Sequence, residues 1–149
     1  MSINKIKEID SLFNRFDSIY HQIAIKQGLT DTEFRILWEI LVLGESCTQT
    51  EIYTSICINK QTVNSAIKQL AKKEIIYFEN GKGREIKIFL TEKGKNIVNE
   101  KIKPIEQIES EIVNEMEIEE FNEFTRIASK YINRLEQKIK LLFNTKGDN

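Results

Sequence analysis

Two Thr-x-x-Glu motifs near the middle of the chain fix the starts of two helices. They are Thr30 to Glu33 and Thr48 to Glu51, and in such a capping box the threonine and glutamate side chains bond the first free backbone amides of a helix. Gly44 predicts the end of the first helix, and residues 56–59 form a tight turn after the second. Asn59 then caps a longer third helix. The second and third of these helices are therefore expected to form a helix-turn-helix.

A β-hairpin is expected directly after the third helix. Residues 75–78 form a short β-type run, residues 79–83 contain two glycines suited to a turn, and residues 84–90 alternate apolar and polar side chains. Helix, turn, helix and hairpin in this order make up a winged helix. The predicted fold class is therefore mainly α with a small β-hairpin.

Amphipathic helices are expected on both sides of this module. Apolar residues recur at steps of three and four over residues 3–26 and again over residues 118–143. A further helix follows Gly94, and Pro104 inside it predicts a kink or a break. These helices carry more apolar surface than the small central module can cover, so we expect a homodimer in which a second copy covers the rest.

The predicted organisation therefore has three parts. Residues 1–28 form an N-terminal dimerisation helix, residues 29–94 form a winged helix-turn-helix DNA-binding domain, and residues 95–149 form C-terminal dimerisation helices and a short tail. The chain has 149 residues and is 40% hydrophobic, which is enough for a sizeable core. No segment has the length and apolar character of a membrane span or a signal peptide, so we expect a cytoplasmic protein that does not bind membranes.

Catalytic and metal sites are not expected. The sequence has no recognisable pairing of a nucleophile with a base and no phosphate-binding glycine loop, so neither an enzyme nor a cofactor is predicted. His21 is the only histidine, and a zinc site would lack its usual nitrogen ligands. Cys47 and Cys57 have neither zinc spacing nor a disulfide framework, and both are expected to pack as thiols. Oxidant sensing by these cysteines is the alternative.

Charge is strongly segregated along the chain although the net charge is only -1. Residues 59–87 carry seven bases and three acids, a net charge of +4, whereas residues 100–123 carry nine acids and two bases, a net charge of -7. Phosphate attracts the first segment and repels the second. A nucleic-acid partner is therefore expected to contact residues 59–87.

The third helix supplies the side chains for reading double-stranded DNA. At about 100° per residue, Val63, Ala66, Ile67 and Leu70 share one face, and the opposite face is polar. Amides bond adenine edges, hydroxyls bond bases or phosphates, and lysines neutralise phosphates. Lys60, Lys68, Lys72 and Lys73 are the expected phosphate contacts. The predicted DNA-binding residues are Thr48, Gln49, Asn59, Lys60, Gln61, Thr62, Asn64, Ser65, Lys68, Lys82 and Arg84. The alternative is a solvated helix face and a solvated hairpin tip.

Four sequence pieces resemble the MarR (multiple antibiotic resistance regulator) family. They are Leu29-Thr30 with Glu33 to Leu37; Thr48-Gln49 with Glu51-Ile52; Gln61 to Asn64 with Ile67, Leu70 and Lys73; and Arg84 with Leu90 to Gly94. The resemblance implies a homodimeric transcriptional regulator, usually a repressor, on a pseudo-palindromic site. It also implies that the third helix enters the major groove and that Arg84 of the hairpin, or wing, enters the minor groove.

The chain departs from the family pattern at three positions. Lys82 replaces an aspartate that often fixes the wing, Ser65 replaces a frequent arginine, and Glu74 replaces the glycine that ends the recognition helix. Without that arginine, and with Asn and Gln present, an A·T-rich operator is expected. Glu74 predicts a different exit turn, and Lys82 predicts a wing that is held differently.

Release by a small aromatic or lipophilic effector is also implied by the resemblance. Candidate pocket residues are the aromatic and imidazole side chains Phe13, Phe16, Tyr20, His21 and Trp38. Packing in a core is the alternative account of the same residues. A third class of protein also fits the pattern, namely a winged-helix dimer that acts as a protein-binding accessory or anti-repressor subunit. Composition cannot separate a lysine that faces DNA from one that faces an acidic protein.

Overall fold

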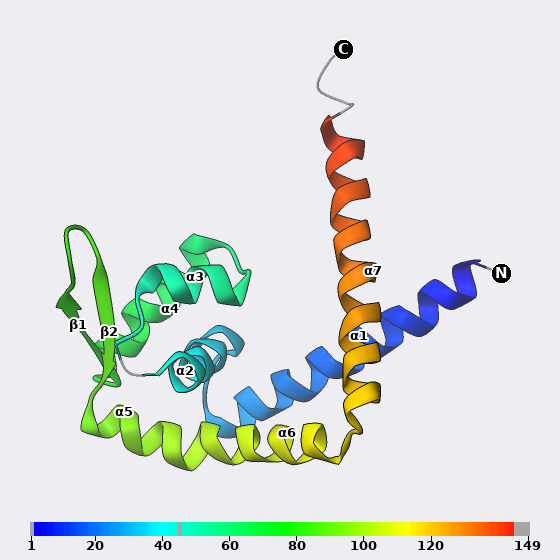
Figure 1. The fold of residues 1–149 in the computed structure, drawn as a ribbon. Helices are drawn as coiled ribbons and strands as arrows, with labels where there is room; N and C mark the ends of the chain where they lie inside the picture. The colour runs from blue at the N-terminus through cyan, green and yellow to red at the C-terminus, as the bar shows by residue number, and fades with distance from the viewer. Residues whose placement is uncertain (1, 45, 145–149) are drawn as a thin grey trace. The chain divides into compact units, whose positions relative to one another are not determined.

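The computed structural model describes residues 2–44 and 46–144 and divides the chain into two compact units, Met1–Ile105 and Glu106–Asn149. The predicted fold class is confirmed, because helices dominate and the strands form one two-stranded antiparallel hairpin among the described residues (Figure 1). The elements are α1 (Ser2–Gln27), α2 (Asp31–Leu43), α3 (Gln49–Ile56), α4 (Lys60–Lys72), β1 (Ile76–Asn80), β2 (Ile86–Leu90), α5 (Glu92–Ile97), the π-helical turn η1 (Val98–Ile102), α6 (Lys103–Glu115) and α7 (Ile118–Asn144).

Both predicted capping boxes are present at the starts of α2 and α3. The Thr30 hydroxyl accepts a hydrogen bond from the Glu33 amide at 3.1 Å, and the Glu33 carboxylate accepts one from the Thr30 amide at 3.0 Å. Thr48 and Glu51 repeat the pattern at 3.1 and 2.7 Å. These bonds satisfy amides that have no partner inside the helix, so the sequence located both helix starts.

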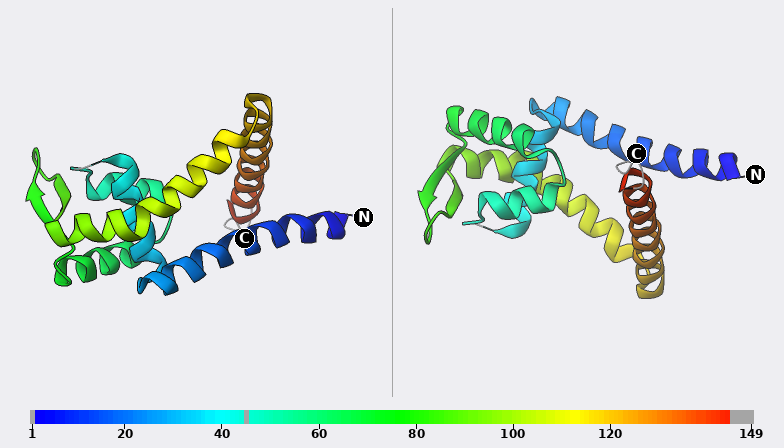
Figure 2. Two further views of the ribbon diagram at one scale, coloured as in Figure 1. Left: turned by 90° about the horizontal axis from the view of Figure 1, so that it is seen from below. Right: turned by 90° about the horizontal axis from the view of Figure 1, so that it is seen from above.

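The core of the first unit joins α2, α3 and α4 to the hairpin. One face of each helix is buried, and β2 contributes Ile88, which is fully buried. A short bridge from Thr48 to Lys87 and the bond from the Ile88 amide to the Cys47 carbonyl, 2.8 Å long, tie the hairpin to the start of α3. The hairpin tip extends beyond the helices (Figure 2). The helix-turn-helix and the wing therefore share one core.

The strand boundaries differ from those predicted. The first strand runs two residues further, to Asn80, and pairs in antiparallel register from Ile76 opposite Leu90 to Asn80 opposite Ile86. The prediction that the second strand begins at Arg84 is wrong, because Gly83 has a φ of 65° and the Glu85 amide bonds the Lys82 carbonyl within the turn. Arg84 therefore lies in the tip of the wing.

Directly before Pro104 the regular α-helix is interrupted by a π-helical turn, which divides it into α5 and α6. The chain passes from α5 through η1 into α6, and the Lys103 amide bonds the Val98 carbonyl five residues earlier. Proline has no amide proton, and in an α-helix its ring would meet the carbonyl of Glu100. The wider π-helical turn directly before Pro104 accommodates this change. No helix among the described residues is long and apolar enough to cross a membrane.

The expectation for the two cysteines holds for one of them. Cys47 is buried, and its burial, together with the nearby Glu51 charge, raises the pKa of its thiol to about 11. Packing is the wrong prediction for Cys57, which is exposed. Its backbone ends α3 in the left-handed region with a φ of 55°, and its thiol donates to the Thr54 carbonyl. The cap geometry at the tight turn thus places this side chain at the surface.

Candidate nucleic-acid interface

The two faces of α4 separate as predicted. Val63, Ala66, Ile67 and Leu70 are buried, so they anchor the helix in the core. The opposite side of the helix is exposed, with Gln61, Thr62, Ser65, Lys68 and Lys72. A polar helix face that is held by a fully buried opposite face is the geometry needed to enter a major groove.

The first turn of α4 uses some of its own polar side chains to stabilise the helix. The side-chain oxygen Oδ1 of Asn59 accepts a hydrogen bond from the Gln61 backbone amide at 2.8 Å, so this side chain caps the helix. The Ser65 hydroxyl donates to the Gln61 carbonyl at 3.0 Å. The Asn59 amide nitrogen and the Ser65 oxygen lone pairs remain for an outside partner.

Tyr53 of α3 contacts two of the predicted DNA-binding residues. Its hydroxyl donates to the side-chain carbonyl of Asn64, and the Lys60 Nζ lies over its ring, 5.2 Å from the centroid. Sequence reasoning missed Tyr53, because its contacts join α3 to α4 and no local sequence pattern marks them. Thr48 and Gln49 lie at that cap, where both the amide proton and the hydroxyl proton of Thr48 are donated to Glu51.

The wing tip is fixed by Glu85, which the sequence analysis also missed. Its carboxylate accepts a hydrogen bond from the Lys82 amide at 3.2 Å, and its carbonyl accepts one from the Gly81 amide at 2.9 Å. Lys82 and Arg84 are exposed on this tip. An acidic residue therefore does hold the wing, but it follows Arg84 instead of preceding it. The sequence signal that could have identified this contact is the position of Glu85, an acidic residue directly after the wing arginine Arg84.

The turn that ends α4 contains one residue, Glu74, in the left-handed backbone conformation. Glu74 has a φ of 57°, and the Ile75 amide bonds the Leu70 carbonyl at 3.0 Å while the Glu74 amide bonds the Ala71 carbonyl at 2.9 Å. This pair of bonds is a Schellman motif, which usually has glycine at the left-handed position. Glutamate therefore takes up the backbone conformation of the expected glycine, and the prediction of a different exit turn is wrong.

The Leu90 to Gly94 motif closes the wing against that exit turn. The Thr91 hydroxyl donates to the Glu74 carbonyl at 2.7 Å, and the Thr91 amide donates to the Ile75 carbonyl at 3.1 Å. Gly94 lies so close that a Cβ atom there would be 2.0 Å from the Ile75 carbonyl oxygen. The motif thus joins the end of the recognition helix to the exit of the hairpin.

A buried ion pair links α2 to the same end of α4. The Lys73 Nζ lies 2.6 Å from a Glu33 carboxylate oxygen, and the Glu33 side chain is only 3% exposed. Burial raises the pKa of Glu33, but hydrogen bonds from Lys73 and Thr30 and the Lys73 charge outweigh it, so the pKa is below its ordinary value. The Lys73 ammonium therefore faces Glu33, whereas the sequence suggested a phosphate contact.

Aromatic side chains of α1 and α2 form a cluster that includes three predicted effector residues. Ring centroids of Phe16 and Tyr20 are 4.9 Å apart, and those of Tyr20 and Trp38 are 6.4 Å apart. Phe34, which was not predicted, completes the cluster at 6.1 Å from both Tyr20 and Trp38. Phe13 does not appear among these ring contacts and is 48% exposed.

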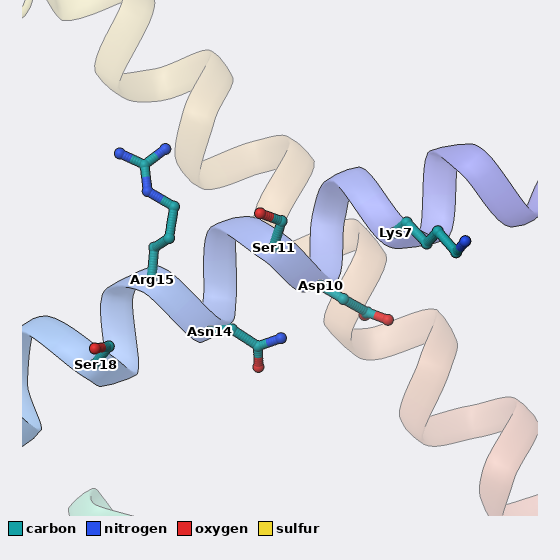
Figure 3. Close-up of a pocket in the computed structure, with 6 residues that line it drawn as sticks. All are labelled: Lys7, Asp10, Ser11, Asn14, Arg15 and Ser18. Carbon is teal, nitrogen blue, oxygen red and sulfur yellow. The ribbon is translucent and has the colours of Figure 1, made fainter.

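His21 and the pocket on α1 are separate from the aromatic cluster. The His21 Nδ1 lies 2.9 Å from the Asp31 carboxylate. Figure 3 shows a pocket on α1, and its lining is polar: Lys7, Asp10, Ser11, Asn14, Arg15 and Ser18. At about 100° per residue, this lining and the Phe13–Phe16–Tyr20 side lie on opposite faces of α1. The pocket therefore contains none of the predicted effector residues.

Taken together, a capped helix-turn-helix, an exposed polar face on its second helix and an adjoining hairpin define a winged helix-turn-helix protein. A model of the MarR family matches residues 29–83, the segment from the start of α2 to the wing. Over this segment the chain is similar to the MarR family of transcriptional regulators.

Solved structures of the family share the fold over most of the chain. A MarR family regulator from Neisseria meningitidis, NMB1585, is 20% identical with a TM-score of 0.77, covering 91% of this chain and 96% of its own. Staphylococcus aureus MepR, in a complex with DNA, is 18% identical with a TM-score of 0.66, covering 87% and 96%. Staphylococcus aureus MarR, in complex with salicylate and kanamycin, is 18% identical with a TM-score of 0.65, covering 91% and 93%. A comparison with curated protein sequences gave no match.

Proposed function

We propose that this chain is a cytoplasmic homodimeric repressor that binds a pseudo-palindromic, A·T-rich operator. The exposed polar face of α4, opposite its four buried residues, is the observation that carries the proposal. The solved complex of MepR with DNA supports it at the level of the fold. In this proposal residues 29–94 bind DNA, and residues 1–28 and 95–149 form the dimer.

The side chains of α4 divide by chemistry into base contacts and phosphate contacts. Gln61, Thr62, Asn64 and Ser65 are proposed to read bases, because amides and hydroxyls match base-edge donors and acceptors. The exposed ammonium groups of Lys60, Lys68 and Lys72 are proposed to neutralise phosphates. Lys82 and Arg84 extend the contacts from the wing.

Binding to DNA from the chain's own upstream region, measured at two salt concentrations, tests this function. The wild-type protein is expected to select one fragment and to lose affinity steeply with salt, because each phosphate contact contributes about -0.9 to the slope of log K against log salt. Gln61→Ala should weaken selection about tenfold, as a lost base contact costs 1–3 kcal/mol or about 5- to 150-fold. Arg84→Ala should reduce the salt slope.

Gln69→Ala is the matched control, because Gln69 is also an exposed glutamine of α4 but lies two turns beyond Gln61. It should retain selection. Absence of fragment selection by the wild-type protein, together with capture of an acidic protein partner, would support the accessory-subunit alternative instead.

The dimer proposal rests on apolar surface that each terminal helix leaves exposed. In α1 this surface includes Ile3, Ile6, Leu12, Phe16 and Ile19, and in α7 it includes Ile118, Phe124, Ile127, Ile132, Leu135 and Ile139. Monomeric proteins rarely expose apolar stripes of this length. A second copy of the chain is the proposed cover, as most soluble oligomers are symmetric.

Leu135→Glu should dissociate the dimer. A carboxylate buried in an apolar interface without a partner costs about 3 kcal/mol, which corresponds to a dimer about 100-fold weaker. Light scattering should give the mass of two chains for the wild-type protein and of one chain for this variant. Lys130→Glu, an exposed position of the same helix, should leave the mass at two chains; a single-chain mass for the wild-type protein would refute the dimer.

Effector release is proposed for the aromatic cluster. Phe16, Tyr20 and Trp38 offer apolar rings, and the Tyr20 hydroxyl offers a polar group, a combination suited to a small aromatic or lipophilic acid. The solved complex of Staphylococcus aureus MarR contains salicylate, an acid of this type. Thermal shifts across a panel of phenolic and fatty acids test the proposal, and a panel without any shift would remove it.

A further inference from the structure

Tyr53 is positioned to control how Asn64 meets DNA. It lies half-buried on α3, and its hydroxyl bonds the side-chain carbonyl of Asn64 on α4. The Lys60 ammonium lies over the same ring, 5.2 Å from its centroid. Lys60 and Asn64 are four residues apart and therefore lie on one side of α4. One side chain from α3 thus holds two polar side chains of the recognition helix.

The phenol is the donor in the bond between Tyr53 and Asn64. Burial raises the pKa of Tyr53, so its hydroxyl is protonated at neutral pH. The amide of Asn64 offers a carbonyl acceptor at one end and two N–H donors at the other. With the carbonyl end turned to Tyr53, the N–H₂ end is left for an outside partner.

This orientation changes which base suits Asn64. Bidentate bonding to adenine needs both the carbonyl and the N–H₂ group of an asparagine, because adenine presents N7 as an acceptor and N6 as a donor. Guanine presents two acceptors, N7 and O6, on the same edge. An N–H₂ group with two protons matches the guanine pattern, and it does not match the N6 donor of adenine.

We propose that Tyr53 is a specificity-determining positioning residue, which holds the Asn64 amide so that its N–H₂ group reads a guanine in each half-site. This inference rests on the proposed DNA-binding function and deepens it. It also modifies the expectation of an A·T-rich site, since one base pair per half-site becomes G·C.

Selection of binding sites from a randomised duplex library tests the proposal with full-length protein. Asn64→Ala should abolish preference at one base pair per half-site and so locate the contact. At that position the wild-type protein should prefer guanine over adenine by about fivefold or more, the lower limit for a good base contact. Tyr53→Phe frees the Asn64 carbonyl and should move the preference towards adenine at that position alone.

The double variant Tyr53→Phe/Asn64→Ala should match Asn64→Ala, because Tyr53 acts through Asn64. Tyr77→Phe is the matched control, because it removes the hydroxyl of an exposed tyrosine on β1. It should select the wild-type site. The salt slope of Tyr53→Phe should equal that of the wild-type protein, because the ring under Lys60 is retained.

Three results would overturn the inference while the proposed function stands. These are a wild-type preference for adenine at the Asn64 position, an unchanged guanine preference in Tyr53→Phe, and an equal loss of preference at every position in Tyr53→Phe. The last would indicate a general structural role, which thermal unfolding of the same variant would register. If the wild-type protein selected no site at all, the proposed function itself would fail.

Discussion

Gly94→Ala is expected to lower the free energy of unfolding by about 3 kcal/mol, the upper end of the usual cost of overpacking a tight site. A Cβ atom at this position would lie 2.0 Å from the Ile75 carbonyl oxygen and 3.2 Å from a methyl group of Leu90. The leucine methyl can move, but the carbonyl belongs to a backbone that also accepts the Thr91 amide at 3.1 Å. Relief of the clash therefore requires the junction between α4 and the hairpin to shift.

Thermal and urea unfolding measure this effect. A loss of 3 kcal/mol corresponds to a fall of about 10 °C in Tm for a chain of this size. Asn96→Ala is the control, because Asn96 is exposed and lies only two residues away, and it should change the stability by less than about 0.5 kcal/mol. An equally small change in Gly94→Ala would show that the junction is not as tight as the contact distances indicate.

The most accurate sequence predictions concern features that nearby residues determine. Each capping box closes within four residues, so Thr30 and Thr48 located two helix starts from the sequence alone. The burial of Val63 and Leu70 followed from helical period, because one face of a short amphipathic helix must face the core. Local chemistry was sufficient in these cases.

Features that depend on distant residues were not predictable in the same way. The bond between Tyr53 and Asn64 joins side chains 11 positions apart, and the Lys73–Glu33 pair joins side chains 40 apart. Neither spacing has a sequence signature. The pair also reverses the assignment of Lys73, since a lysine at the end of a recognition helix has the same sequence context whether it meets a phosphate or a buried carboxylate.

Glu74 and Pro104 show a different limit of sequence reasoning. Both residues are unfavourable for the local backbone, and the sequence therefore predicted an altered turn at one and a kink or break at the other. The surrounding structure decides how the backbone accommodates each residue. Thr91 bonds the carbonyl of Glu74 at 2.7 Å and helps to hold its left-handed conformation, and the π-helical turn before Pro104 lets the helix continue.

Lys73→Met should destabilise the protein by about 2 kcal/mol at neutral pH. The Glu33 side chain is 3% exposed and loses its charged partner, and breaking a buried ion pair costs about 3–5 kcal/mol. We reduce that figure because the Lys73 side chain is 45% exposed and water screens the pair. Lys72→Met is the matched control, as it removes an exposed lysine one position away, and it should be nearly neutral.

The pH dependence of this difference separates an ion-pair effect from a packing effect. The pKa of Glu33 is lowered in the folded protein, so its stabilising contribution is complete above the unfolded pKa of 4.5 and is lost as the pH falls through the folded value. In Lys73→Met, burial of the carboxylate is no longer offset by the lysine, and protonation of Glu33 relieves the penalty. The gap between the two proteins should therefore be largest near pH 7, should begin to shrink as the pH falls towards 4.5 and should shrink further below it. A gap that stays constant from pH 7 to pH 3.5 would assign the effect to lost packing of the lysine stem.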